Sequence, residues 1–333
     1  MKYTFIITLA VALIFTSCKK HRPTTPVCPI TLIGYNALSD TGTTYPALFS
    51  MYGIGTIDLP GGVTGNIASL SRSINRKASG EHYQGAYNTS DNCYYTFLDS
   101  GSRARLCKIT SSGAISIYQC TTDSVPFEAL VYNAVSNKLM ALNHGPSDTL
   151  VEITPTGGSF SYAPIAQLAN EEVRYSSATI DQTTGTLYVA ANFYTPSCYR
   201  VLKIAPGAST FSMVDSQSSQ LLDAIEYSNT DHMLYAFRHL LNPAQTLLYF
   251  VRIDPAGGSA NVSTSPITIG KYFSSTFDQC NNRYIASNQK YTVTGSSITW
   301  SSDSSAVLQI DPSGSLVQTN YLSGLFLGIA VKP

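Results

Sequence analysis

The sequence is poor in charge and contains a single tryptophan. Its 333 residues include 20 Lys and Arg against 20 Asp and Glu, and charged residues make up 12% of the chain. This share is about half of that in an ordinary globular protein. Such sparse and balanced charge argues against a nucleic-acid partner, because phosphate contacts require a clustered basic face. The apolar share of 44% is too high for a disordered chain.

Short motifs of familiar active sites are also missing. The sequence has no Cys-x-x-Cys pair and no Cys/His cluster, which argues against a zinc site. It lacks a Gly-x-Ser-x-Gly elbow, an Asp-rich calcium loop and a phosphate-cradling glycine loop. Its five His residues share no ligand-like spacing. We therefore expect a non-catalytic protein without a resident cofactor.

The amino-terminal segment is typical of an export signal. Lys2 precedes an apolar run of eleven residues, 5–15, which is too short for a bilayer span of about 20 residues but fits a secretory signal. The next residues, Phe15-Thr16-Ser17-Cys18, resemble a bacterial lipobox. The resemblance implies cleavage of residues 1–17 and attachment of lipid to Cys18, which anchors the protein in a membrane. The alternative is a plain secretory signal with an incidental cysteine.

Residues 18–28 are expected to form an extended tether, because Lys, Arg, Pro and Thr dominate them. This start resembles lipoproteins of the Bacteroidota type. In that group, acidic residues directly after the cysteine are associated with surface export, and here the residues are basic. The resemblance therefore implies an outer-membrane lipoprotein that faces the periplasm.

Six cysteines remain after Cys18, and their even number permits disulfides in an exported protein. Six cysteines allow fifteen connectivities, so the pairing stays open. Three of them fall in one sequence repeat, which makes a bridge between neighbouring strands there plausible. The six are Cys28, Cys93, Cys107, Cys120, Cys198 and Cys280.

Two sequence landmarks recur with a period near 49 residues. The first is a strand end followed by a turn, as in Ile153-Thr154-Pro155-Thr156-Gly157-Gly158, and its Ile positions are 52, 44, 51, 49 and 57 apart. Pro and Gly in these copies supply the dihedral angles of a tight turn. The second is a strand, a polar turn and another strand. Its anchor residues are Tyr87, Tyr132, Ile180, Tyr227, Phe277 and Val331.

Each repeat is predicted to hold four short strands, because its segments are rich in Val, Ile, Tyr, Phe and Thr and are bounded by turn residues. Four strands in 40–50 residues indicate a β-propeller blade. We expect an all-β, six-bladed propeller of four-stranded blades over residues 29–333. A strand near 325–331 would complete the blade formed by residues 29–70 and thereby close the ring.

The pattern Leu-Tyr-x-Ala followed by Leu-x-x-Ile-Asp-Pro-x-Gly resembles six-bladed propellers of the NHL, gluconolactonase-like and YWTD types. The sequence lacks the YWTD tetrapeptide, the WD dipeptide and the kelch double glycine. The resemblance therefore implies a generic propeller and does not single out one family.

Aligning the anchors predicts a ring of residues around the central channel, four positions before each anchor. This column includes the candidate ligand site Tyr83, Glu128, Ser176 and Asp223. One interpretation is a site for a small polar ligand. Another is a divalent cation held by Glu128 and Asp223, where the gluconolactonase-like resemblance implies a catalytic metal. A third is that these carboxylates are merely solvated.

The sequence thus predicts a monomeric, lipid-anchored module of the cell envelope. It would bind an envelope protein or a small polar ligand without catalysis. The alternative is a metal-dependent enzyme of the lactonase or lyase type that uses the channel carboxylates.

Overall fold

The computed structural model describes most of the chain from Cys28 onward. The expected signal, Cys18 and the tether up to residue 27 lie outside the described residues. Within the described ranges the chain forms strands and no helix, so no helix there is long and apolar enough to cross a membrane. The described ranges are 28–38, 51–59, 63–70, 81–82, 84–98, 104–122, 127–143, 148–169, 173–194, 197–240, 247–263, 267–268, 272–294 and 297–333.

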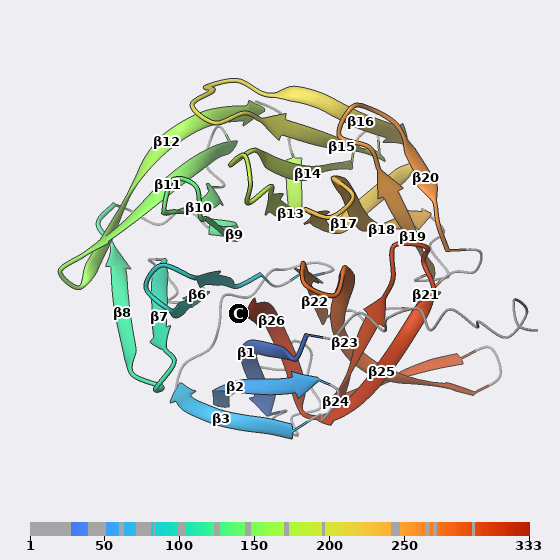
Figure 1. The fold of residues 1–333 in the computed structure, drawn as a ribbon, viewed down its shortest axis with the longest axis horizontal. Coiled ribbons are helices and arrows are strands. Elements are labelled where there is room, and N and C mark those ends of the chain that lie inside the picture. Colours follow the sequence, from blue (N-terminus) through green and yellow to red (C-terminus); the bar gives the residue numbers. More distant parts are fainter. Residues whose placement is uncertain are drawn as a thin grey trace, which may run out of the picture.

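The strands form five sheets, which Figure 1 shows arranged in a ring. One has the order β26-β1-β2-β3, with β1 (Ile30–Leu38), β2 (Met51–Leu59), β3 (Val63–Leu70) and β26 (Leu325–Lys332). A second contains β13 (Val173–Ile180), β14 (Leu187–Tyr194), β15 (Ser197–Ile204) and β16 (Ser212–Ser218) in chain order. A third contains β17 (Gln220–Ser228), β18 (Met233–Leu240), β19 (Leu247–Ile253) and β20 (Ser259–Asn261), with β21 (Ile267–Thr268) also paired to β19.

The two remaining sheets are larger. One has the order β25-β24-β23-β22-β4, with β4 (Glu81–His82), β22 (Tyr272–Asp278), β23 (Arg283–Thr294), β24 (Ser297–Ile310) and β25 (Leu316–Ser323). The other has eight strands in the order β5-β6-β7-β8-β12-β11-β10-β9. Its strands are β5 (Ala86–Asn88), β6 (Cys93–Leu98), β7 (Arg105–Thr110), β8 (Ile115–Cys120), β9 (Phe127–Asn133), β10 (Lys138–Asn143), β11 (Asp148–Thr156) and β12 (Ser159–Ala169).

The eight-stranded sheet consists of two antiparallel four-stranded runs, β5–β8 and β9–β12. Their outermost strands pair in parallel at Ser159 with Gln119 and at Phe160 with Cys120. This pairing merges two predicted blades into one sheet, which is why the structure has five sheets. The prediction of an all-β propeller built from four-stranded sheets is confirmed.

The two ends of the described chain share one sheet. Strand β26 pairs antiparallel with β1, for example Leu32 with Val331. A disulfide joins Cys28 to Cys280, 252 residues away in sequence. The start of the propeller is therefore held both by strand pairing and by a covalent bond to the turn after β22.

The expected bridge among Cys93, Cys107 and Cys120 is wrong, because all three carry free, buried thiols. Cys93 and Cys107 lie on the adjacent strands β6 and β7, but the register places Cys93 opposite Thr110 and Cys107 opposite Thr96. The two thiols therefore do not face each other. The thiol of Cys198 is free as well.

The hydrophobic core fills the seams between neighbouring sheets. Between β18–β19 and β23, the rings of Phe237 and Phe250 meet Tyr284 with centroids 5.4 and 5.0 Å away. Leu32 on β1 belongs to a cluster with Ile285 on β23. Buried aromatic side chains contribute most to such seams, since each removes a large apolar area from water.

The hairpin turn after each inner strand repeats one local design. The residue after the anchor accepts backbone N–H bonds, as when Asn133 Oδ1 binds the Val135 N–H at 3.0 Å. Asn137, five residues after the anchor, has a positive φ of 54°. The hydroxyl of the anchor Tyr132 donates to Asn137 Oδ1 at 2.9 Å. Such side-chain turns are typical of Asn and Asp, and here they place the inner strands around the axis.

Candidate functional site

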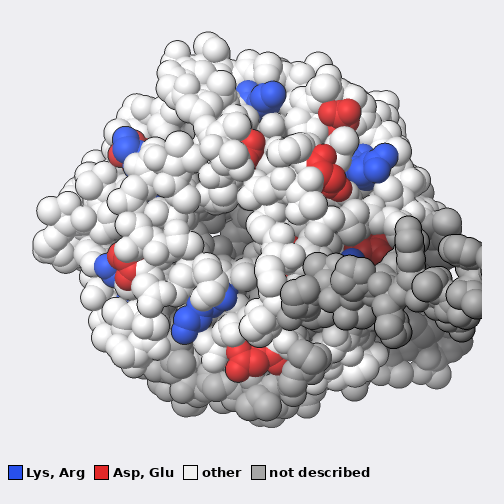
Figure 2. All heavy atoms as spheres, in the orientation of Figure 1, with Lys and Arg blue, Asp and Glu red and all other residues white. Residues whose placement is uncertain are grey.

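A cavity of about 440 Å³ lies on the axis of the ring, between the carboxyl-terminal halves of the inner strands. Residues of β5, β9, β13, β17, β22 and β26, together with the turns that follow them, line it. Figure 2 shows a hollow near the middle of the ring, on a face with few charged residues. A volume of this size is enough for a small molecule.

The chain itself crosses the middle of the ring beside this cavity (Figure 1). Strand β4 pairs in parallel with the start of β22, and four residues later β5 begins in a different sheet. Between them, Gln84 Nε2 donates to Ala178 O at 2.8 Å, and Gln84 Oε1 accepts from the Ala178 N–H at 3.1 Å. Both Gln84 and Gly85 line the cavity. The crossing segment therefore bounds the cavity from within the channel.

Gly85 is required at this crossing. A Cβ atom there would collide with the ring and hydroxyl of Tyr94. The Tyr94 hydroxyl is itself fixed, because it donates to Gly328 O at 2.6 Å. The sequence must therefore have a residue without a side chain where the crossing segment meets the second strand of its sheet.

Glu226 is the most unusual polar residue of the cavity wall. It lies on β17 and is 8% exposed. The Ser275 hydroxyl from β22 donates to Glu226 Oε1 at 2.6 Å, and the Thr179 hydroxyl from β13 approaches Glu226 Oε2 at 3.5 Å. These three polar side chains come from three consecutive inner strands. They form one hydrogen-bonded row along the wall.

Burial raises the pKa of Glu226 to about 8, although the hydroxyls of Ser275 and Thr179 act in the opposite direction. Desolvation penalises the carboxylate, whereas hydroxyl donors favour it. At neutral pH the group is therefore mainly a neutral acid. A carboxyl group whose pKa lies near the working pH is suited to exchanging a proton or pairing with a ligand.

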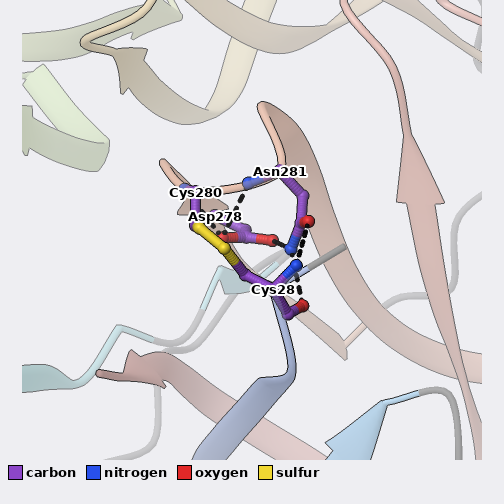
Figure 3. Close-up of a disulfide and its surroundings, with 4 residues drawn as sticks. All are labelled: Cys28, Asp278, Cys280 and Asn281. Atoms are coloured by element: carbon purple, nitrogen blue, oxygen red, sulfur yellow. Dashed lines mark hydrogen bonds between the residues drawn. A yellow bond between two sulfur atoms is a disulfide. The ribbon is translucent and has the colours of Figure 1, made fainter. Parts of the chain in front are cut away.

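The second acidic residue of the wall, Asp278, forms hydrogen bonds within the turn after β22, at the rim of the cavity. Its Oδ1 accepts from the Cys280 N–H at 3.0 Å, and its Oδ2 accepts from Asn281 Nδ2 at 2.6 Å. Figure 3 shows that Asn281 also bonds to Cys28, which is disulfide-bonded to Cys280. The carboxylate of Asp278 thus stabilises this turn. We call the Cys28–Cys280 disulfide, together with the bonds of Asn281 to Cys28, the latch.

Glutamine side chains connect the rim from one sheet to the next. Gln182 Oε1 accepts from the Ala134 N–H at 2.9 Å, and Gln182 Nε2 donates to Tyr132 O at 2.7 Å. Gln279 makes the same pair of bonds to the turn after β17. The mouth of the cavity is therefore braced by side chain to backbone bonds.

Two of the four predicted ligand residues have described side chains, and neither is part of the cavity wall that the structure describes. Tyr83 lies outside the described residues, and the side chain of Ser176 is likewise not described. Glu128 on β9 and Asp223 on β17 are absent from the described wall. Asp223 Oδ2 instead lies beside His239 Nε2, and Asp223 Oδ1 accepts from Asn192 Nδ2 at 3.4 Å. A ligand role for these four residues stays a prediction.

A β-bulge explains why the sequence prediction missed Glu226. On β17 the register shifts between Asp223 and Glu226, so that two residues face one on β18, and Ala224 has a positive φ of 58°. A bulge reverses the alternation of side chains beyond it. The residues that line the cavity therefore include those one position before each anchor. They are Ala86, Val131, Thr179, Glu226, Thr276 and Ala330.

A sequence signal for Glu226 does exist. Among the six residues one position before the anchors, it is the one with a charged side chain. Strict strand alternation places Glu226 on the opposite face from Asp223, whereas the bulge brings both residues to the same face. The same shift occurs on β9, where Ala129 has a φ of 50°, and on β26, where Gly328 has a φ of 59°.

The described residues offer no set of three His, Cys, Asp or Glu side chains close enough to hold a metal ion. Glu128 and Asp223 therefore find no third ligand among them. A divalent cation at Glu128 and Asp223 therefore stays a prediction.

Comparison with known proteins places the chain by fold. No protein-family model and no curated protein sequence matches it. Among solved structures it resembles TolB from Acinetobacter baumannii, with 11% identity over 91% of this chain and 66% of that one and a TM-score of 0.58. It also resembles a chain of a nidogen/laminin complex, with 9% identity, 92% and 99% coverage and a TM-score of 0.60.

A third similar structure is the periplasmic gluconolactonase PpgL of Pseudomonas aeruginosa. The identity is 13% over 91% of this chain and 99% of that one, with a TM-score of 0.51. Likeness at this level of identity concerns the fold alone. The chain shares the propeller architecture of these proteins.

Proposed function

We propose that this protein is a binding propeller whose axial cavity takes a small molecule. The observation that carries the proposal is an axial cavity with a buried carboxyl group and two hydroxyls on an otherwise largely apolar wall. Ligand pockets typically combine apolar walls with a few convergent polar groups. The crossing segment and the braced rim supply a preformed shape, which lowers the entropic cost of binding.

The proposed propeller has six blades. The count treats β5–β8 and β9–β12 as separate blades, since each is an antiparallel four-stranded run. Pairing of β26 with β1 and the Cys28–Cys280 disulfide support a ring closed between the two chain ends. A closed ring leaves no open blade at either end for unwanted strand pairing.

The proposed setting is the cell envelope, with a lipid on Cys18, residues 18–28 as tether and the propeller from residue 29 facing the periplasm. The apolar run and the lipobox-like residues support this placement, and one similar structure is described as periplasmic. Growth with radioactive palmitate tests it. Label should enter the wild-type protein and not the Cys18→Ala variant, whereas labelled Cys18→Ala would contradict lipidation at that residue.

Filling the cavity tests the binding function. Ala330 lies on β26 in the wall and is buried, so Ala330→Phe should occupy the space that a ligand needs. A thermal-shift screen of small metabolites should give hits with the wild type and with the control Ala260→Phe on the exposed strand β20. Hits that stabilise Ala330→Phe equally would place binding elsewhere and contradict the proposal.

An enzyme acting on an uncharged ester or lactone is the second candidate. The Ser275–Glu226 hydrogen bond of 2.6 Å favours it, because the carboxylate form of Glu226, which prevails above a pH of about 8, can act as a general base. Glu226 would take the hydroxyl proton as Ser275 attacks the carbonyl carbon. The ring C–O bond would then break, the leaving oxygen would receive that proton, and water would release the acyl group.

This candidate predicts acid release from simple lactones, which a pH-stat records. The rate should fall at least a hundredfold in Ser275→Ala and in Glu226→Gln. Equal rates in both variants and in buffer would remove the enzyme candidate and leave the binding proposal standing.

A further inference from the structure

The ionisable side chains of the described cavity wall are all acidic, apart from tyrosines. Its described residues include two acidic side chains, Glu226 and Asp278, and no Lys, Arg or His. Lys332 lies between the wall residues Val331 and Pro333 but is not one of them. Because Asp278 is engaged by its own turn, Glu226 is the acidic group that faces a ligand. An anionic ligand would meet a buried carboxyl group and no compensating positive charge.

The hydrogen bonds around Glu226 are arranged for its ionised form. Ser275 donates to one carboxyl oxygen, and the Thr179 hydroxyl lies next to the other. Thr179 also accepts the Tyr227 N–H at 3.1 Å, so its own proton is free to be directed at the carboxyl group. Two hydroxyl donors on two oxygens stabilise a carboxylate. Burial alone opposes the charge, and a positive partner would remove that opposition.

The rest of the wall suits an apolar body. Four of the six anchor positions carry aromatic rings, and all four contribute to the wall: Tyr87, Tyr132, Tyr227 and Phe277. The Tyr132 and Tyr227 hydroxyls are bonded within their own hairpin turns, to Asn137 and His232. These polar tips are therefore already satisfied. The rings provide apolar contact area, and aromatic faces also attract cations.

We infer that the axial cavity binds a small organic cation, whose ammonium group pairs with the carboxylate of Glu226 and whose apolar part lies among the anchor rings. The inference rests on the proposed binding function of the cavity. Binding of the cation is coupled to release of a proton from Glu226. The neutral acid loses its proton to the solvent as the ammonium ion arrives, so one positive charge enters the site and one leaves.

No other titratable group close to Glu226 competes for this role among the described residues. From β13 it meets Thr179, and from β22 it meets Ser275. From β23 it faces the phenol of Tyr284, whose pKa burial raises well above its ordinary value and which donates to Ala224 O at 2.6 Å. On β17 itself the next carboxylate is Asp223, which lies beside His239. The proton released on binding therefore comes from Glu226.

Isothermal titration calorimetry with the purified full chain tests the inference. The probes are benzylammonium and phenethylammonium, with benzyl alcohol as the neutral counterpart and phenylacetate as the anionic one. Titration in two buffers of different ionisation enthalpy gives the number of protons released. At pH 7 we expect about nine-tenths of a proton per bound ammonium, from a pKa of about 8. At pH 8, where the ammonium probes are still protonated, this number should fall to about one half.

Variants separate the inference from the binding function. Glu226→Gln should lose at least tenfold in ammonium affinity and all proton release, while keeping any affinity for benzyl alcohol. The control Glu152→Gln, half-buried on β11 and outside the described cavity wall, should match the wild type. Benzyl alcohol binding as tightly as the ammonium probes, without proton release, would overturn the cation inference and leave the cavity a binding site. Failure of all four probes, together with unchanged screening hits in Ala330→Phe, would overturn both.

Discussion

Two carboxyl groups on β17, three residues apart, occupy opposite kinds of environment. Asp223 is buried beside His239 and Asn192, with a basic partner at hand. Glu226 is equally buried, but it contacts two neutral hydroxyls on the wall of the axial cavity. A paired carboxylate stabilises structure, whereas one without a cation keeps its proton and is available to a ligand. Three residues along one strand thus separate a mainly neutral acid in the cavity wall from a carboxyl group beside a histidine.

The largest expected effect concerns the pH dependence of stability. The pKa of Glu226 is raised by burial from 4.5 to about 8, so the folded state holds a proton that the unfolded state has lost. The full stability is present below about pH 4.5 and falls as pH rises towards 8. The loss for this group is on the order of 5 kcal/mol by linkage. Urea unfolding between pH 5 and 9 measures it.

Replacing one carboxyl group at a time sharpens the comparison. Glu226→Gln should flatten this part of the stability curve, because no group in the wall then takes up a proton on folding. Asp223→Asn should leave that slope in place and lower stability instead, since it removes the partner of His239. A slope that survives in Glu226→Gln would show that another group causes it.

The next effect concerns the latch at the cavity rim. The Cys28–Cys280 disulfide closes a loop of 252 residues, and its loss should cost about 2–5 kcal/mol, mainly by freeing the unfolded chain. The paired variant Cys28→Ser with Cys280→Ser avoids a stray thiol. Amide hydrogen exchange should rise in β26 and β1 more than in β17. Uniform exchange throughout the ring would show that the latch does not act locally.

Several features of the fold were predictable from the sequence because they depend on local chemistry. The Asn and Asp residues after the anchors, such as Asn133 and Asp181, cap their turns as side-chain acceptors do elsewhere. The four-stranded repeats follow from these turns and from strand composition. The pairing of Cys28 with Cys280 was not predictable, since it joins residues that the ring brings together only after folding.

The location of the site was harder to predict, because it depends on irregular strands. Ala224 and Ala129 adopt positive φ without being glycine. An alanine side chain does not indicate such a conformation, so the bulges could not be predicted from the sequence. At Ala224 a contact between sheets accompanies this conformation, because the Tyr284 hydroxyl donates to Ala224 O. Each bulge shifts the face on which later residues lie. Sequence periodicity therefore assigned Glu226 to the face opposite Asp223, whereas the structure places both on one face and only Glu226 in the cavity wall.

The bulge itself can be tested at Ala224. A β-branched residue is strongly disfavoured at a φ of 58°, so Ala224→Val should lower the unfolding free energy by about 2–3 kcal/mol. It should also disturb the register between Asp223 and Glu226. The pKa of Glu226, followed by NMR titration of its side-chain carbon, should then move back towards 4.5. The control Ala236→Val lies opposite the bulge on β18 and should destabilise by overpacking without moving this pKa.

The smallest expected effect isolates the hydroxyl donors. Ser275 donates to Glu226 at 2.6 Å and thereby lowers the pKa against the larger effect of burial. Ser275→Ala removes this donor, so the pKa of Glu226 should rise further, by about 1 unit for a hydrogen bond worth roughly 1.4 kcal/mol. Removing the more distant hydroxyl in Thr179→Val should raise it less. A lower pKa in Ser275→Ala would mean that water has entered the wall and solvated the carboxylate, and the contrast between a dry Glu226 and a paired Asp223 would then depend on a single serine.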